Sequence, residues 1–158
     1  MSGGTPDRVL AVCTGNICRS PFAERYLRRL AAVGGVELRA SSAGTHACPG
    51  TRATPEARLA ASEFGVDLDG HRARSLLLQD LEDASLVLAM TPSHARLLEP
   101  MFLSMPPDLR PRIEVFDVPD PFGRGLERYR DCYAKLASLL DRWFEERFPP
   151  PEGGKRGP

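Results

Sequence analysis

The chain has 158 residues, hydrophobic residues make up 42% of it, and 21 basic side chains balance 21 acidic ones. This size and apolar content fit a single globular domain, and the zero net charge gives no support to a nucleic-acid or membrane-surface partner. No apolar run approaches the roughly 20 residues of a membrane span, and the four scattered cysteines do not form the pattern of a secreted disulfide scaffold. We therefore expect a cytoplasmic protein, a monomer or weak homodimer, that binds neither nucleic acid nor membrane.

Apolar runs and amphipathic segments alternate along the chain. Strands are predicted over residues 8–12, 36–42, 86–90 and 112–116. Helices are predicted over residues 22–33, 54–65, 79–83, 91–103 and 126–143. This alternation predicts a three-layer α/β fold with a four-stranded, parallel, twisted sheet flanked by helices. The domain is expected to span residues 8–148, between an N-terminal tail of residues 1–7 and a Pro/Gly-rich, disordered tail of residues 149–158.

The stretch Cys-Thr-Gly-Asn-Ile-Cys-Arg-Ser-Pro, residues 13–21, lies between the first predicted strand and the first predicted helix. Backbone N–H groups at a helix N-terminus lack intrahelical partners and, with the helix dipole, favour an anion there. Gly15 and Asn16 tolerate a left-handed backbone, which lets successive amides turn inward. We predict a phosphate-binding loop after the first strand, formed by Thr14, Gly15, Asn16, Ile17, Cys18, Arg19 and Ser20.

Cys13 and Arg19 give this loop a nucleophile and a binding fork. The planar guanidinium of Arg19 suits two oxygens of a phosphate, and together with the loop amides it favours thiolate over thiol at Cys13. Ser20 is expected either to donate its hydroxyl to this thiolate or to cap the helix that Pro21 opens. Because the arginine and the amides supply the positive field, we expect neither a metal nor a cofactor.

Three other interpretations of these residues stay open. Cys13 and Cys18 could be inert, small residues of the core. Their spacing also suits a structural zinc site, which Cys48, Cys132 or a histidine would have to complete. The loop could finally bind phosphate without catalysing any reaction.

A thiolate that displaces an aryl oxide needs an acid to protonate the leaving oxygen. Asp120 is the predicted acid, because it follows the last strand within the stiff segment Pro-Asp-Pro-Phe. Asp117 lies nearer the strand end and is expected to be structural. The wall of the substrate site is predicted to consist of Ile17, Thr45, His46 and Phe122.

Residues 13–21 resemble the signature of the low-molecular-weight protein tyrosine phosphatases, and the resemblance continues through residues 42–44, 70–74 and 120–122. It implies an enzyme that hydrolyses phosphotyrosine in proteins, and small aryl phosphates, through a phosphocysteine intermediate, with inorganic phosphate as product. Cys13, Arg19 and Asp120 would then be its catalytic residues.

The resemblance also implies supporting roles for other residues. Ser42 and His71 would form a hydrogen-bond network with Asn16 that fixes the loop, with Ser20 beside them. Cys18 would make oxidative inactivation reversible by pairing with Cys13. Outside this network, Arg74 is expected to form a structural ion pair and His94 to lie at the surface of a helix.

Two further activities occur on similar scaffolds. Arsenate reductases relay electrons through a nearby cysteine pair, whereas Cys48 and Cys132 are isolated in this sequence. Arginine phosphatases carry threonine at the position of Ile17, so this residue favours phosphotyrosine. Because Gly123 replaces a second aromatic residue after Phe122, we expect a loose preference for the peptide around the phosphotyrosine.

Overall fold

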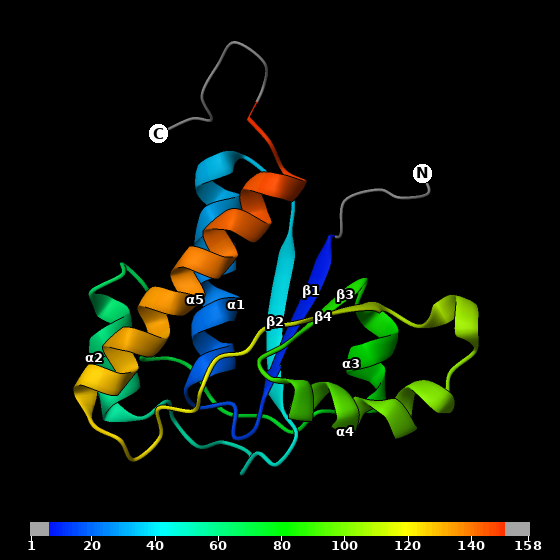
Figure 1. Cartoon of the computed structure of the whole chain (residues 1–158), viewed down its shortest axis with the longest axis horizontal. Helices are drawn as coiled ribbons and strands as arrows, with labels where there is room; N and C mark the ends of the chain where they lie inside the picture. The colour runs from blue at the N-terminus through cyan, green and yellow to red at the C-terminus, as the bar shows by residue number, and fades with distance from the viewer. Residues whose placement is uncertain (1–6, 151–158) are drawn as a thin grey trace.

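A parallel sheet lies at the centre of the computed structural model, which describes residues 7–150 (Figure 1). Its strands are β1 (Arg8–Cys13), β2 (Arg39–Gly44), β3 (Leu86–Ala89) and β4 (Arg112–Val115), in the order β2-β1-β3-β4. The helices are α1 (Arg19–Gly34), α2 (Pro55–Ser62), α3 (Leu78–Asp83), α4 (Pro92–Leu103) and α5 (Leu126–Arg147). The predicted α/β class with a four-stranded parallel sheet is confirmed.

Helices cover both faces of the sheet: α1, α2 and α5 lie on one side, and α3 and α4 on the other (Figure 1). Successive β1 side chains point to opposite faces, so Val9 and Ala11 join the core with α1 and α5 while Leu10 and Val12 join the core with α3 and α4. Because both faces of this central strand are buried, its sequence is a continuous apolar run. Stacking of Phe22 on Tyr133, with ring centroids 4.1 Å apart, ties α1 to α5.

Two predicted boundaries were wrong for local reasons. Strand β2 begins three residues later than predicted, because Gly35, at φ 65°, ends α1 and the N–H of Val36 caps the carbonyl of Ala31. Pairing starts where Arg39 lies opposite Arg8. Helix α1 begins already at Arg19, so Ser20 lies inside its first turn and Cys18 occupies the N-cap without a side-chain hydrogen bond.

The carboxyl ends of the strands meet at one edge, where α/β proteins place their ligands. Cys13 ends β1 directly beside Gly44 at the end of β2. A Cβ on Gly44 would lie 2.5 Å from the carbonyl oxygen of Thr14, so only glycine lets these two segments approach so closely.

Within residues 7–150 no helix combines the length and the apolar character needed to cross a bilayer. The predicted tails lie almost wholly outside the described residues. The boundaries of the domain, 8 and 148, therefore stay predictions.

Candidate active site

The sulfur of Cys13 sits at the end of β1, in a residue that is only 2% exposed. It lies 2.9 Å from the hydroxyl oxygen of Ser20 in the first turn of α1. Ser20 Oγ also accepts a hydrogen bond of 2.9 Å from the amide Nδ2 of Asn16. Because an amide nitrogen can only donate, the single hydroxyl proton of Ser20 is left for the sulfur. Of the two roles predicted for Ser20, donation to Cys13 is the one that its position allows.

Asn16 connects the loop to its surroundings. It is completely buried, and its backbone adopts the left-handed conformation at φ 56°. Its Nδ2 donates to Ser42 as well as to Ser20, at 2.9 Å each. Its Oδ1 accepts from the N–H of Arg74 at 3.0 Å, and its carbonyl accepts from Nε2 of His71 at 2.7 Å. The structure thus brings Asn16, Ser20, Ser42 and His71 together, as the resemblance implied.

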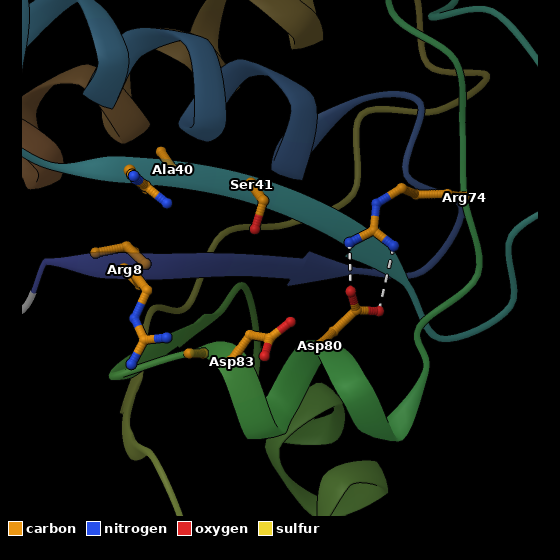
Figure 2. A pocket seen from close by; sticks show the side chains of 9 residues that line it. Arg8, Ala40, Ser41, Arg74, Asp80 and Asp83 are labelled. Carbon is orange, nitrogen blue, oxygen red and sulfur yellow. Dashed lines mark hydrogen bonds and ion pairs between the residues drawn. The ribbon is translucent and has the colours of Figure 1, made fainter.

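The outer part of this network is anchored by two charged residues. Ser42 donates to a carboxylate oxygen of Glu24 at 2.7 Å, and Glu24 is 7% exposed. The guanidinium of Arg74 forms the expected ion pair with Asp80 at the start of α3, as Figure 2 shows beside Ser41. The role of Glu24 was not predicted, although it lies one helical turn after Ser20 and therefore on the same face of α1.

The imidazole of His71 is held neutral inside this network. Burial lowers its pKa below 6.5, and the hydrogen bond to the carbonyl of Asn16 opposes this only in part. The neutral ring carries its proton on Nε2, because the carbonyl can only accept. His71 therefore holds the loop in place through the carbonyl of Asn16.

Arg19 is 3% exposed, and one nitrogen of its guanidinium, Nε, is buried without a partner among the described residues. Its Nη1 donates to the carbonyl of Val118 at 3.0 Å, and its Nη2 lies 3.7 Å from the carboxylate of Asp120. Because buried donors are nearly always satisfied, the N–H of Nε points to an oxyanion as its missing acceptor.

A hollow of about 180 Å³ lies above the sulfur. Its lining consists of Cys13, Thr14, Gly15, Ile17, Cys18, Arg19, Asp120 and Phe122. The predicted nucleophile, the arginine, the acid and two predicted wall residues therefore share one cavity. Thr45 and His46 do not line it. Their backbone N–H groups bind the carbonyls of Cys13 and Thr14 beside the loop.

The two candidate acids occupy different environments. Asp120 lines the hollow, and its Oδ1 accepts from the N–H of Phe122 at 3.1 Å, which orients the carboxylate within its loop. Asp117 is exposed and does not line the hollow, and its carbonyl accepts a hydrogen bond from Lys135. The geometry therefore favours Asp120.

Comparison with known proteins agrees with this geometry. Residues 8–147 match the model of the low molecular weight phosphotyrosine protein phosphatases. The chain belongs to this family. It is 33% identical over 146 residues to the low molecular weight protein-tyrosine-phosphatase Wzb of Escherichia coli (strain K12), covering 88% of this chain and 94% of that protein.

Two further relatives are similar to this chain over nearly their whole length. A protein-arginine-phosphatase of Geobacillus stearothermophilus is 35% identical over 150 residues, covering 89% of this chain and 96% of that protein. The crystal structure of a low molecular weight protein tyrosine phosphatase from T. tengcongensis is 40% identical and superposes with a TM-score of 0.79, covering 89% of this chain and 99% of that one. The predicted family and enzyme class, a phosphoric monoester hydrolase, are confirmed.

Cys18 also lines the hollow of this phosphatase, but as a neutral thiol. Its sulfur lies 3.1 Å from the hydroxyl of Tyr129, which in turn accepts from Thr54. Burial raises the pKa of Cys18 to about 12, and the hydrogen bond with Tyr129 lowers it only in part. No disulfide joins Cys18 to Cys13, and both are free thiols.

The prediction for His94 was wrong: this residue is 4% exposed and contacts the loop. Its Nε2 lies 2.8 Å from the hydroxyl of Thr14, and its Nδ1 lies 2.9 Å from that of Thr91, the N-cap of α4. Burial and then the charge of Arg19 lower the pKa of His94 to about 4, so the ring is neutral at pH 7. Sequence reasoning missed this contact because the two partners are far apart in the chain.

Cys132 is less isolated than its place in the sequence suggested. It is buried on α5, close enough to the site to interact electrostatically with Arg19 and Cys18. Burial raises its pKa to about 12. Cys48, by contrast, is exposed. Among residues 7–150 no three His, Cys, Asp or Glu side chains are grouped as metal ligands, so the zinc interpretation gains no ligand set.

Proposed function

We propose that this phosphatase hydrolyses phosphotyrosine in proteins, and small aryl phosphates, through a phosphocysteine intermediate on Cys13. The observation that carries the proposal is the buried, unpartnered Nε of Arg19 in the same hollow as the Cys13 sulfur and the Asp120 carboxylate. One tetrahedral oxyanion placed there would satisfy the guanidinium and bring phosphorus within reach of the sulfur.

The reaction proceeds in two steps. The Cys13 thiolate attacks phosphorus in line, the bond from phosphorus to the tyrosine oxygen breaks, and protonated Asp120 gives its proton to that oxygen. Asp120 then takes a proton from a water molecule, which attacks the phosphocysteine and releases inorganic phosphate. Arg19 and the backbone of residues 14–20 bind the equatorial oxygens throughout, with Ser20 stabilising the sulfur as it becomes the leaving group.

Ile17 and Phe122 support the choice of an aromatic substrate. Both line the hollow, and Phe122 is 57% exposed, which leaves its ring available as a flat wall. The similarity to an arginine phosphatase makes phosphoarginine the competing substrate. Ile17→Thr is the informative variant, because it replaces the apolar wall by a hydroxyl.

Kinetics with three phosphopeptides test this proposal. We expect turnover of phosphotyrosine to exceed that of phosphoarginine and phosphoserine, with Cys13→Ser as the inactive blank. Asp120→Asn should lower kcat on phosphotyrosine by about 10²–10⁴, and Asp117→Asn should have little effect. The reverse order of the two aspartate variants would refute the assignment of the acid, and faster turnover of phosphoarginine would refute the substrate.

A redox role for Cys18 is proposed on the same geometry. Peroxide would oxidise the Cys13 thiolate to a sulfenic acid, and the Cys18 thiol would displace its hydroxyl group as water to form a disulfide. Their shared place in the lining of the hollow supports this step.

The reducing cytoplasm is the proposed location of the protein, because all four cysteines are free. A monomer or weak homodimer is its proposed oligomeric state.

A further inference from the structure

A second hollow of about 350 Å³ opens on the other side of the Asp120 loop. Its lining consists of Pro119, Asp120, Pro121, Arg124, Arg128, Asp131, Cys132 and Lys135. Asp120 belongs to the lining of both hollows, so the two are neighbours separated by one short segment of chain. A polypeptide whose phosphotyrosine fills the first hollow would pass close to the second.

Three cations and two carboxylates line this second hollow. Both carboxylates have a cationic partner, whereas two of the cations have no carboxylate partner among the described residues. Within the described residues the exposed guanidinium of Arg124 has neither a hydrogen bond nor an ion pair. Lys135 donates to the carbonyl of Asp117, which leaves its charge unneutralised. Arg128 lies 3.9 Å from Asp131, but both side chains are more than 60% exposed, so water screens this pair.

The carboxylates near the hollow are largely engaged elsewhere. Asp120 lies 3.7 Å from Arg19 on the catalytic side. Glu127, in the first turn of α5, pairs with Arg130, which also binds Glu63. The N-terminus of this 22-residue helix adds the positive end of its dipole close to Arg124. Of the two carboxylates that line the hollow, Asp120 thus pairs with Arg19 and Asp131 with Arg128.

The segment directly after β2 carries no such charges. Residues 45–48 read Thr-His-Ala-Cys and contain no Asp, Glu, Lys or Arg. The hollow on the α5 side, by contrast, is lined by three cations and two carboxylates, whose summed charge gives a weakly positive field there. Such a field selects among substrates by the charge that accompanies the phosphotyrosine.

We propose that the hollow formed by Arg124, Arg128 and Lys135 binds the carboxylate of an Asp or Glu close to the phosphotyrosine in the substrate protein. An extended peptide rises about 3.3 Å per residue, so side chains up to three residues from the tyrosine lie within about 10 Å of it along the peptide. This inference rests on the proposed function and adds to it a substrate class, phosphotyrosine in an acidic sequence.

The test compares phosphotyrosine peptides that carry one Glu, at each position from three before to three after the tyrosine, with otherwise identical Gln peptides. For the favoured position we expect kcat/KM to be about two- to fivefold higher with Glu, which is the range of exposed ion pairs. The ratio should fall toward one in Arg124→Gln and at high salt, where charges are screened. Arg142→Gln, an exposed arginine further along α5, is the matched control and should keep the ratio of the unmodified enzyme.

Binding of the same peptides to Cys13→Ser, measured by fluorescence anisotropy, separates the two proposals. Turnover of the peptides without any preference for Glu would overturn the acidic subsite and leave the phosphatase proposal intact. Binding that depends on Glu and on Arg124, with no turnover by the unmodified enzyme, would overturn the reaction and support the subsite. An equal ratio in Arg124→Gln and Arg142→Gln would also overturn the subsite.

Discussion

Replacing Asn16 by alanine tests the architecture of the phosphate-binding loop most directly. The side chain of this fully buried residue makes hydrogen bonds to Ser20, Ser42 and the N–H of Arg74. Its backbone is in the left-handed region, at φ 56°. Alanine loses all of these hydrogen bonds and keeps an unfavourable backbone conformation.

The expected loss in the free energy of unfolding has two contributions, the lost hydrogen bonds and the unfavourable backbone conformation. Each lost hydrogen bond lowers the free energy of unfolding by about 1 kcal/mol, and a non-glycine residue without a polar side chain costs about 1 kcal/mol more in the left-handed region. We therefore expect Asn16→Ala to be destabilised by about 4 kcal/mol, a large part of the ~5–15 kcal/mol that stabilises a typical domain. Asn16→Gly loses the same bonds without the backbone penalty and should be destabilised by about 3 kcal/mol.

Urea unfolding at pH 7 measures these differences, and turnover of p-nitrophenyl phosphate reports the geometry of the site. Ser42→Ala removes two bonds of the network, to Asn16 and to Glu24, and serves as a control, with an expected loss of about 2 kcal/mol. Asn16→Ala should also lower kcat/KM strongly, because Ser20 loses the donor that orients its hydroxyl. An Asn16→Ala variant within about 1 kcal/mol of the unmodified protein, or an Asn16→Ala variant more stable than Asn16→Gly, would refute this reasoning.

Two more predictions follow from the buried groups around the site. Because the pKa of His94 is about 4 in the folded protein, below its usual 6.5, the unfolded chain binds a proton first. Stability should therefore fall as the pH falls from about 6.5 to 4, by at most about 3 kcal/mol, and the fall should be shallower in His94→Gln when both are followed by urea unfolding. His71, whose pKa burial also lowers, acts in the same direction and remains in that variant. In Cys18→Ser, excess peroxide should carry the unprotected sulfenic acid of Cys13 on to the sulfinic acid, which thiols do not reduce, and unchanged recovery of activity with dithiothreitol would contradict the proposed disulfide with Cys13.

The loop could be predicted because its structure is decided locally. Within residues 13–21 the spacing of cysteine, glycine, arginine and proline between an apolar and an amphipathic run leaves few alternatives to a strand, a tight turn and a helix. The prediction for Asp120 also rested on position, since a loop after a parallel strand returns to the carboxyl edge of the sheet. Thr45 and His46 follow β2 at the same edge, yet they do not line the hollow.

The missed contacts all join distant parts of the chain. Glu24 becomes part of the site only when α1 packs beside β2, where it receives the hydrogen bond of Ser42. His94 reaches Thr14 because the N-terminus of α4 follows β3, the direct neighbour of β1. Cys132 approaches Arg19 because α5 crosses the same face of the sheet as α1 (Figure 1).

By itself, the sequence determined the family and the fold class, and it predicted the residues proposed to carry the chemistry, because each depends on residue type and short-range spacing. The tertiary structure alone decided which polar groups surround those residues and where charged side chains gather beside them. Hydrogen bonds act over about 3 Å, so partners far apart in the sequence are selected only when packing of the helices on the sheet brings them together. The cationic hollow beside Asp120 depends on that packing as well, since it joins a loop after β4 to the first turns of α5.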